Sequence, residues 1–188
     1  MRKNFKRHIQ GKKVLLIFLL TNLVYCCMLF ITLPKVMSYA NGMTLFDMMP
    51  TGYDLEYVNQ LLNSLGSEGR NAYQYVQLPA DMIYPFLFGL SYSLMLAYFL
   101  NILGWIEKPI FLVVFLPVIA GLFDYLENLG ILTMLNAYPH LSSTTVALTN
   151  SFTIIKSTLS TISFILLLIF IILFFVQRRR LVKTVTNH

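Results

Sequence analysis

Residues 110–134 read IFLVVFLPVIAGLFDYLENLGILTM, an apolar stretch that is interrupted by charge only at Asp124 and Glu127. A transmembrane α-helix needs roughly 20 predominantly apolar residues to cross about 30 Å of hydrocarbon, and this stretch has that length. Working outward along the chain, the same criterion selects three further segments, 14–33, 82–103 and 152–176. The sequence therefore predicts an all-α integral membrane bundle of four transmembrane helices.

The composition indicates that lipid is the main solvent of this chain. Hydrophobic residues make up 57% of the 188 residues and charged residues 12%, with a mean hydropathy of +0.68. A soluble globule of this composition has too few polar side chains to cover its surface. The length suits a single membrane domain over residues 1–188 and leaves no room for a separate soluble enzyme domain.

Basic residues flank the first and last spans and predict the orientation of the chain. They are Arg2, Lys3, Lys6, Arg7, Lys12 and Lys13 before the first span, and Arg178, Arg179, Arg180 and Lys183 after the last. Cationic flanks stay on the cytoplasmic side of a membrane. We therefore expect a bacterial plasma membrane protein with both termini in the cytoplasm and with the loops 34–81 and 136–150 outside.

The net charge of +6 follows from these flanks and does not indicate a nucleic-acid partner. Nucleic-acid sites carry basic residues along a groove with aromatic side chains between them, whereas these basic residues border spans and suit anionic lipid headgroups. We therefore expect membrane lipids as partners. Cys26 and Cys27 are adjacent in mid-span and no metal-type Cys/His spacing occurs, so the sequence predicts neither a metal nor another cofactor.

The first span has a second interpretation, as a secretory signal peptide. Its basic start, its apolar stretch and the triplet Ser38-Tyr39-Ala40 imitate such a peptide and its small-residue cleavage site. The apolar segment 14–33 is longer than the roughly 7 to 15 residues typical of a signal sequence, so an uncleaved helix is favoured.

The first external loop, 34–81, contains the pattern of two short amphipathic helices. Asp54 is a candidate N-cap for a helix whose leucines recur at helical spacing, and Gly66 is placed to end that helix. A second helix begins near Ser67 and stops before Pro79. Both helices are expected to lie on the membrane surface. The tyrosines expected at headgroup level are Tyr53, Tyr57, Tyr73 and Tyr75.

The span 110–134 is polar toward its outer end. Asp124 and Asn128 lie on one helical face together with Gly121, and Glu127 lies beside them. Pro117 removes the hydrogen bond to the carbonyl four residues earlier, so this helix is expected to bend. Ionised side chains at the centre of a span cost on the order of 2.5 to 3.5 kcal/mol, so these acids require pairing, hydration or neutralisation.

Two neighbouring spans carry polar stripes that match this face. In the span 152–176 and the turn before it, steps of three and four place on one side Thr149, Thr153, Lys156, Ser160 and Ser163. In the span 82–103 and the turn before it, the same steps place on one side Asp81, Tyr84, Phe88 and Ser91. Because consecutive spans alternate in direction, the ionisable members of all three faces lie in the outer half of the membrane.

We therefore expect one polar cluster that faces outward. The candidate ligand-binding residues are Arg70, Asp81, Tyr84, Asp124, Glu127, Asn128, Lys156 and Ser160. Among these, Arg70 would reach the cluster from the loop. The pattern does not assign a catalytic role to any of them.

Each member of the cluster also has a purely structural interpretation. Asp81 is placed to cap the second span at its positive end, and Lys156 is placed to extend toward the outer interface. The serines and threonines of the last span suit helix packing. For Asp124 and Glu127 the alternative to a ligand, ion or catalytic role is an internal salt bridge with Lys156.

Three motifs join the loop to the polar faces of the spans. They are Leu65-Gly66-x-x-Gly69-Arg70-x-Ala72-Tyr73, Asp81-x-x-Tyr84-Pro85 and Asp124-x-x-Glu127-Asn128. Together they resemble a group of small bacterial four-span membrane proteins, a resemblance that covers most of the chain and implies no activity. The general architecture is also similar to the EXPERA family of sterol-related isomerases and sigma-2-like receptors. Those proteins have four or five spans and intramembrane acids. No residue of this chain is matched to one of their functional residues.

Three classes of function fit these patterns. The preferred one is an outer-leaflet-facing binding site for a lipid or a small amphipathic ligand, with basic residues for an anionic part and acids for a cationic one. The second is an intramembrane acid/base enzyme acting on a lipid, with two of the acids as proton donor and base. The third is a subunit or assembly factor whose polar stripes pack against a membrane protein partner or a second copy of the chain.

Overall fold

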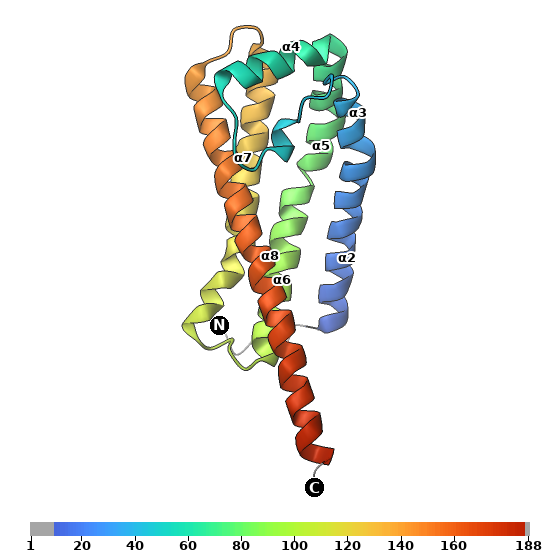
Figure 1. Ribbon diagram of the computed structural model, residues 1–188, viewed down its shortest axis with the longest axis vertical. Coiled ribbons are helices and arrows are strands. Elements are labelled where there is room, and N and C mark those ends of the chain that lie inside the picture. Colours follow the sequence, from blue (N-terminus) through green and yellow to red (C-terminus); the bar gives the residue numbers. More distant parts are fainter. Residues whose placement is uncertain (1–9, 187–188) are drawn as a thin grey trace.

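The computed structural model describes residues 10–186 and contains four helices long and apolar enough to cross a membrane (Figure 1). They are Gly11–Met37, Leu55–Ile102, Pro109–Ala137 and Ser143–Arg179. No strand occurs among the described residues, so the fold is the expected all-α bundle, and its helices fit an integral membrane protein. Outside the described part lie Arg2, Lys3, Lys6 and Arg7 and the side chains of Arg180 and Lys183.

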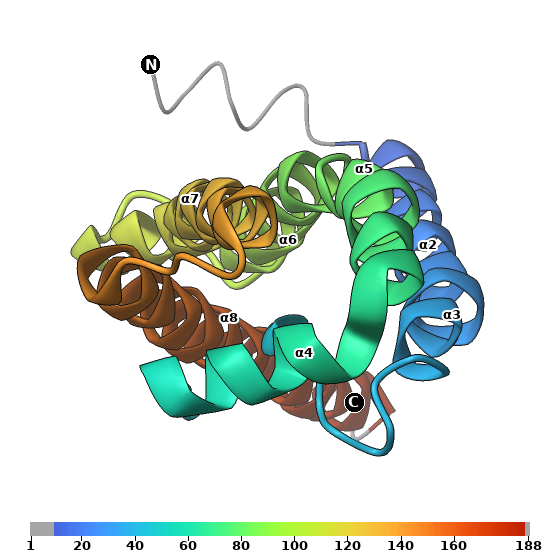
Figure 2. The same ribbon diagram turned by 90° about the horizontal axis from the view of Figure 1, so that it is seen from above.

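Each span combines one long α-helix with shorter turns. The first span consists of α2 (Gly11–Cys27), the π-helical turn η1 (Met28–Thr32) and α3 (Leu33–Met37). The second ends in α5 (Leu78–Asp81) and α6 (Tyr84–Ile102), the third is the 3₁₀ segment η4 (Pro109–Phe115) with α7 (Leu116–Ala137), and the fourth is α8 (Ser143–Thr186). In the bundle α7 packs along both α6 and α8, while α2 packs along α6 (Figure 2).

The first and last helices extend beyond the predicted spans 14–33 and 152–176. The first continues to Met37, and α8 begins already at Ser143. The added residues 143–151 of α8 are rich in hydroxyl side chains, which lower the hydropathy of this segment without breaking the helix. The Thr149 hydroxyl, for example, donates to the carbonyl of Thr145 at 2.8 Å and is satisfied within the helix.

The bend expected at Pro117 takes the form of a change in helix type. Pro117 lies in the first turn of α7, directly after the 3₁₀ segment η4. Proline is tolerated in a first turn because the N–H that it lacks has no partner within the helix there. The proline therefore sets where α7 begins.

An amphipathic helix, α4 (Leu55–Ala72), crosses one end of the bundle (Figure 1). Its N-cap is Asp54, as predicted, because a carboxylate oxygen accepts from the backbone N–H of Tyr57 at 2.8 Å. Gly66 has a non-helical backbone with φ of +60° and ψ of −171°, so α4 consists of two helices that meet at a kink there, and Gly66 ends the first of them as predicted. The apolar face of α4 is buried against the bundle through Leu61, Leu62 and Leu65.

Between α3 and α4 the chain dips into the bundle as the short 3₁₀ turn η2 (Phe46–Met48). Leu45 and Phe46 are both fully buried, and Phe46 packs between the rings of Tyr53 and Tyr73. These two tyrosines therefore pack inside the protein and do not present their rings to lipid headgroups. Irregular backbone at this depth needs polar partners, and Asn150 on α8 supplies one by accepting from the N–H of Tyr53 at 2.9 Å.

The close approach of α6 and α7 depends on Gly121. A Cβ atom at this position would lie 2.7 Å from the backbone carbonyl oxygen of Pro85. We predict that Gly121→Ala lowers the free energy of unfolding by about 1–3 kcal/mol, because the two backbones must move apart. Leu122→Ala, at a neighbouring position that is 58% exposed, is the control and should change stability less. Denaturant titration in detergent micelles compares the two, and equal effects would contradict this account.

Candidate functional site

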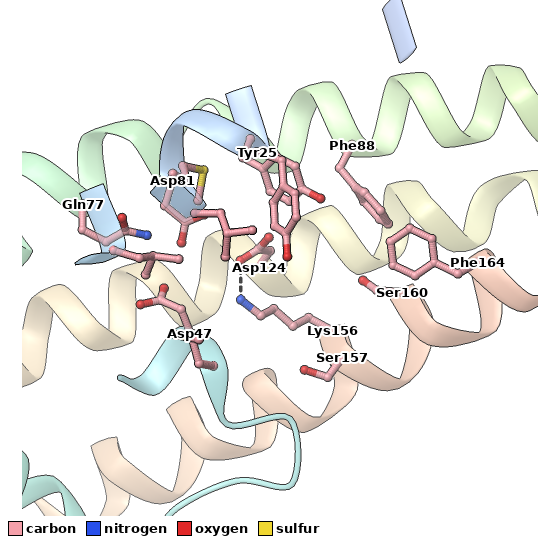
Figure 3. Close-up of a pocket in the computed structure, with 15 residues that line it drawn as sticks. Tyr25, Asp47, Gln77, Asp81, Phe88, Asp124, Lys156, Ser157, Ser160 and Phe164 are labelled. Atoms are coloured by element: carbon pink, nitrogen blue, oxygen red, sulfur yellow. Dashed lines mark hydrogen bonds and ion pairs between the residues drawn. The ribbon is translucent and has the colours of Figure 1, made fainter. Parts of the chain in front are cut away.

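A cavity of about 330 Å³ lies inside the bundle, between α2 on one side and α8 on the other (Figure 3). Its polar lining comes from the helices α5, α7 and α8, from the turn η2 and from Gln77 in the π-helical turn η3 (Tyr73–Gln77), and it includes Asp47, Asp81, Asp124 and Lys156. Its apolar lining includes Tyr25, Met28, Leu29, Phe88 and Phe164. Figure 3 shows the acids toward one end and the rings of Phe88 and Phe164 toward the other.

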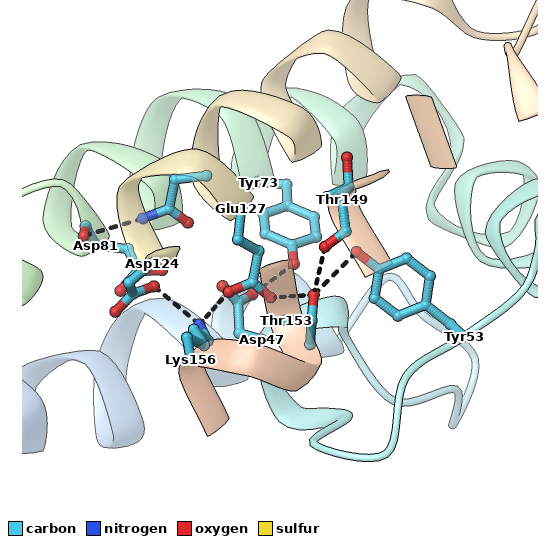
Figure 4. Close-up of polar contacts among 10 residues, drawn as sticks. Asp47, Tyr53, Tyr73, Asp81, Asp124, Glu127, Thr149, Thr153 and Lys156 are labelled. Carbon is cyan, nitrogen blue, oxygen red and sulfur yellow. Dashed lines mark hydrogen bonds and ion pairs between the residues drawn. The ribbon is translucent and has the colours of Figure 1, made fainter. Parts of the chain in front are cut away.

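Lys156 on α8 forms ion pairs with two acids of α7. Its Nζ lies 2.9 Å from Oδ1 of Asp124 and also contacts Oε2 of Glu127 (Figure 4). The side chain of Glu127 is fully buried and that of Lys156 is only 14% exposed. Lys156 therefore points into the bundle and does not extend to the interface, and the internal salt bridge considered above is present.

The polar face of α7 also holds the second span in place. Asn128 is fully buried and donates through Nδ2 to the backbone carbonyl of Asp81 at 3.2 Å. This contact is made where α5 ends, just before the helix restarts at Tyr84. Asp81 is not the N-cap of α6, because that position belongs to Ile83 and no side chain caps it. The carboxylate of Asp81 instead faces the cavity.

A second hydrogen-bonded branch leads from Glu127 toward α4. The Thr153 hydroxyl donates to Oε1 of Glu127 at 2.7 Å, and the Tyr53 hydroxyl lies 3.3 Å from Oγ1 of Thr153 (Figure 4). Burial raises the pKa of the Tyr53 phenol above its ordinary value, so this hydroxyl stays protonated. Both oxygens of Glu127 are thus engaged by protein groups.

Asp47 is a member of the site that the sequence analysis did not single out. It lies on η2, and Oδ2 of its carboxylate accepts from the hydroxyl of the buried Tyr73 (Figure 4). The signal that could have found it is local, because Asp47 stands within the apolar run Leu45-Phe46-Asp47-Met48-Met49 of an otherwise polar loop. Such a run is too short to span a membrane but apolar enough to enter a bundle.

The structure brings together most of the residues predicted for the site. Those that line the cavity are Asp81, Tyr84, Asp124, Lys156 and Ser160, and those buried behind it are Glu127 and Asn128. Arg70 does not join them. It donates from Nη1 to the carbonyl of Leu62 at 2.7 Å, and its guanidinium lies 4.6 Å from the ring centre of Tyr138.

The charges around the cavity do not balance. Four carboxyl groups, those of Asp47, Asp81, Asp124 and Glu127, surround the single lysine of the described lining. The described residues contain no group of histidine, cysteine or acidic side chains that could hold a metal ion. Lys156 is held by two carboxylates and is not placed as a general base.

Comparison with protein-family models, with curated proteins and with solved structures gives no match. The function of the site must therefore be inferred from its geometry.

The salt bridge predicts how the site responds to mutation. Lys156→Met leaves Asp124 and Glu127 buried without a counter-charge, so we expect it to lower the free energy of unfolding by about 3–5 kcal/mol. The triple variant that adds Asp124→Asn and Glu127→Gln should recover most of this loss, because the two acids that lost their counter-charge are then replaced by neutral amides. Thermal unfolding in detergent measures both variants. A triple variant as unstable as Lys156→Met would show that the charges are not the cause.

Proposed function

We propose that this chain is an integral membrane protein that binds an amphipathic ligand. The ligand, a lipid or a smaller molecule, would enter from the bilayer. The main support is the amphipathic lining of the cavity, which has carboxyl groups at one end and aromatic and aliphatic side chains at the other. A polar headgroup fits the first end and an apolar tail the second. The internal salt bridge does not oppose this function, because it occupies only some of the polar groups that face the cavity.

The route into the cavity supports a ligand that arrives through lipid. The residues at the rim are apolar and exposed on the bundle surface, with exposed fractions of 42% for Tyr25, 40% for Met48 and 40% for Phe164. These residues come from α2, η2 and α8, so the opening lies between the first and the last span. Exposed apolar side chains at spanning depth face the acyl chains of a bilayer.

Access from the aqueous side at the α4 end is obstructed. Leu45 and Phe46 fill the space beneath α4 and are fully buried, together with Tyr73. The apolar face of α4 covers these three side chains. A ligand that enters between α2 and α8 avoids this packed region, which favours lateral entry.

The blocking of this opening tests the proposal. Ser160 lines the cavity on α8, and Ser160→Trp would fill the space that a tail needs. We expect the fraction of chains that carry a co-purified amphiphile to fall by about tenfold, which corresponds to about 1.4 kcal/mol of binding free energy. Native mass spectrometry of gently extracted protein measures this fraction and also reports the oligomeric state.

Ser151→Trp on the same helix is the matched control, because Ser151 is exposed and does not line the cavity. It should leave the carried fraction unchanged. An empty wild-type protein, or equal loss in both variants, would contradict the proposed function. Retention of a protein partner in place of a lipid would favour a subunit of a membrane complex.

We further propose that the α4 end faces outward from a bacterial plasma membrane, so that the site opens toward the outer leaflet. The support is the distribution of charge. Lys12, Lys13, Arg178 and Arg179 lie at the end of the bundle opposite α4, whereas Glu56 and Glu68 lie on α4 itself. Cationic residues are retained on the cytoplasmic side.

Cysteine labelling tests this orientation. In a background with Cys26→Ser and Cys27→Ser, we expect a membrane-impermeant maleimide to label Asn71→Cys in intact cells, because α4 would face the medium. Lys108→Cys, in the turn at the opposite end, should be labelled only after permeabilisation. The reverse pattern would place the site in the inner leaflet.

A further inference from the structure

Three polar atoms at one end of the cavity have no hydrogen-bond partner in the protein. They are Nε2 of Gln77, Oδ2 of Asp81 and Oδ1 of Asp47. Gln77 is 0% exposed and Asp81 3% exposed, and all three residues line the cavity. Figure 3 shows the three side chains gathered at the same end. Buried polar groups in native proteins are almost always paired, so this group of atoms points to a ligand.

The carboxyl groups of Asp47 and Asp81 lie within reach of each other, and the other protein groups nearby are already engaged. Lys156 binds Asp124 and Glu127, and Tyr73 donates to the other oxygen of Asp47. The hydroxyl of Thr32 on the first span donates to Oε1 of Gln77, which leaves the amide nitrogen free. Two ionised carboxylates cannot donate to each other, so a donor for them and an acceptor for the amide nitrogen of Gln77 are expected from a molecule in the cavity.

The three atoms specify complementary chemistry. Two carboxylate oxygens require hydrogen-bond donors, and one amide nitrogen requires an acceptor. Four carboxyl groups and a single lysine lie around this part of the described cavity lining, an excess of acidic groups that favours a cation. A ligand head group that pairs with all three atoms has several N–H donors, a positive charge and an oxygen acceptor close to the nitrogen.

We propose that the ligand's head is a primary ammonium with an oxygen acceptor on the neighbouring carbon, as in a vicinal amino alcohol, attached to an apolar chain. This inference rests on the proposed function and names its ligand class. The ammonium donates to Asp47 and Asp81, and Gln77 donates to the oxygen. The chain then runs toward Phe88 and Phe164 and leaves between α2 and α8.

Other head groups satisfy only part of this arrangement. A trimethylammonium head carries the charge but has no N–H to donate. A vicinal diol has donors and acceptors but no charge. A fatty acid places a third carboxylate beside Asp47 and Asp81, where like charges repel.

Binding of a matched series to the full chain in nanodiscs of uncharged lipid tests the inference. The probe is sphinganine, and the competitors of similar chain length are the trimethylammonium compound, the vicinal diol and the fatty acid. We expect sphinganine to bind at least about tenfold more tightly than each competitor, because charged hydrogen bonds contribute most to its affinity. Comparable affinity for the diol or for the trimethylammonium compound would overturn the proposed head.

Two variants locate the head. Asp81→Asn should weaken sphinganine binding by about tenfold and leave diol binding nearly unchanged, since it removes charge but keeps the shape. Gln77→Met should weaken sphinganine and diol alike, and Gln60→Met on the exposed face of α4 is the matched control. Unchanged sphinganine binding in folded Asp81→Asn would overturn the inference. If Asp81→Asn does not fold, the ligand series on the wild-type protein still decides.

Failure of this inference differs from failure of the proposed function. If all four amphiphiles bind equally and Ser160→Trp blocks all of them, the proposed binding site is supported and the proposed amino-alcohol head group is wrong. If none of them binds to the wild-type protein, the inference and the proposed function both fall.

Discussion

The rest of the structure depends on the ion pairs of Lys156 with Asp124 and Glu127 inside the bundle. In a medium of low dielectric an unpaired charge is costly, so α8 must place its lysine opposite the two acids of α7. This requirement sets the rotation of both helices and their register along each other. The same face of α7 then presents Asn128 to the carbonyl of Asp81, which brings the second span into the same arrangement.

The first span contributes no charged side chain to this polar network. The cavity lies beside this span for that reason. α2 packs along α6, where Phe18 meets Tyr92 and the Thr21 hydroxyl contacts the carbonyl of Leu87. No ionic requirement draws it onto α8. The space between α2 and α8 is left to apolar side chains and to the acids that face it, and this combination makes an amphipathic cavity.

The candidate site could be predicted in large part, because its residues recur at helical spacing on three spans. Asp81, Asp124 and Lys156 each stand on a stripe with a period near 3.6, and alternating span direction places them at one depth. Asp47 could not be placed in this way. It lies on no periodic element, and only the packing of Leu45 and Phe46 under α4 carries it into the bundle. Arg70 stands apart from the site for another reason, since its long side chain allows several partners and its guanidinium is held by the carbonyl of Leu62 and the ring of Tyr138.

The sequence by itself determined the number of spans, the amphipathic helix α4 with its cap at Asp54, and the polar faces of three helices. Each of these depends on residues close together in the chain, through hydrophobic length, capping and helical period. The tertiary structure decided which acids pair with Lys156, which polar atoms stay without a partner, and where the cavity opens. Those outcomes depend on distances between residues far apart in the chain, which only the packing of the helices defines.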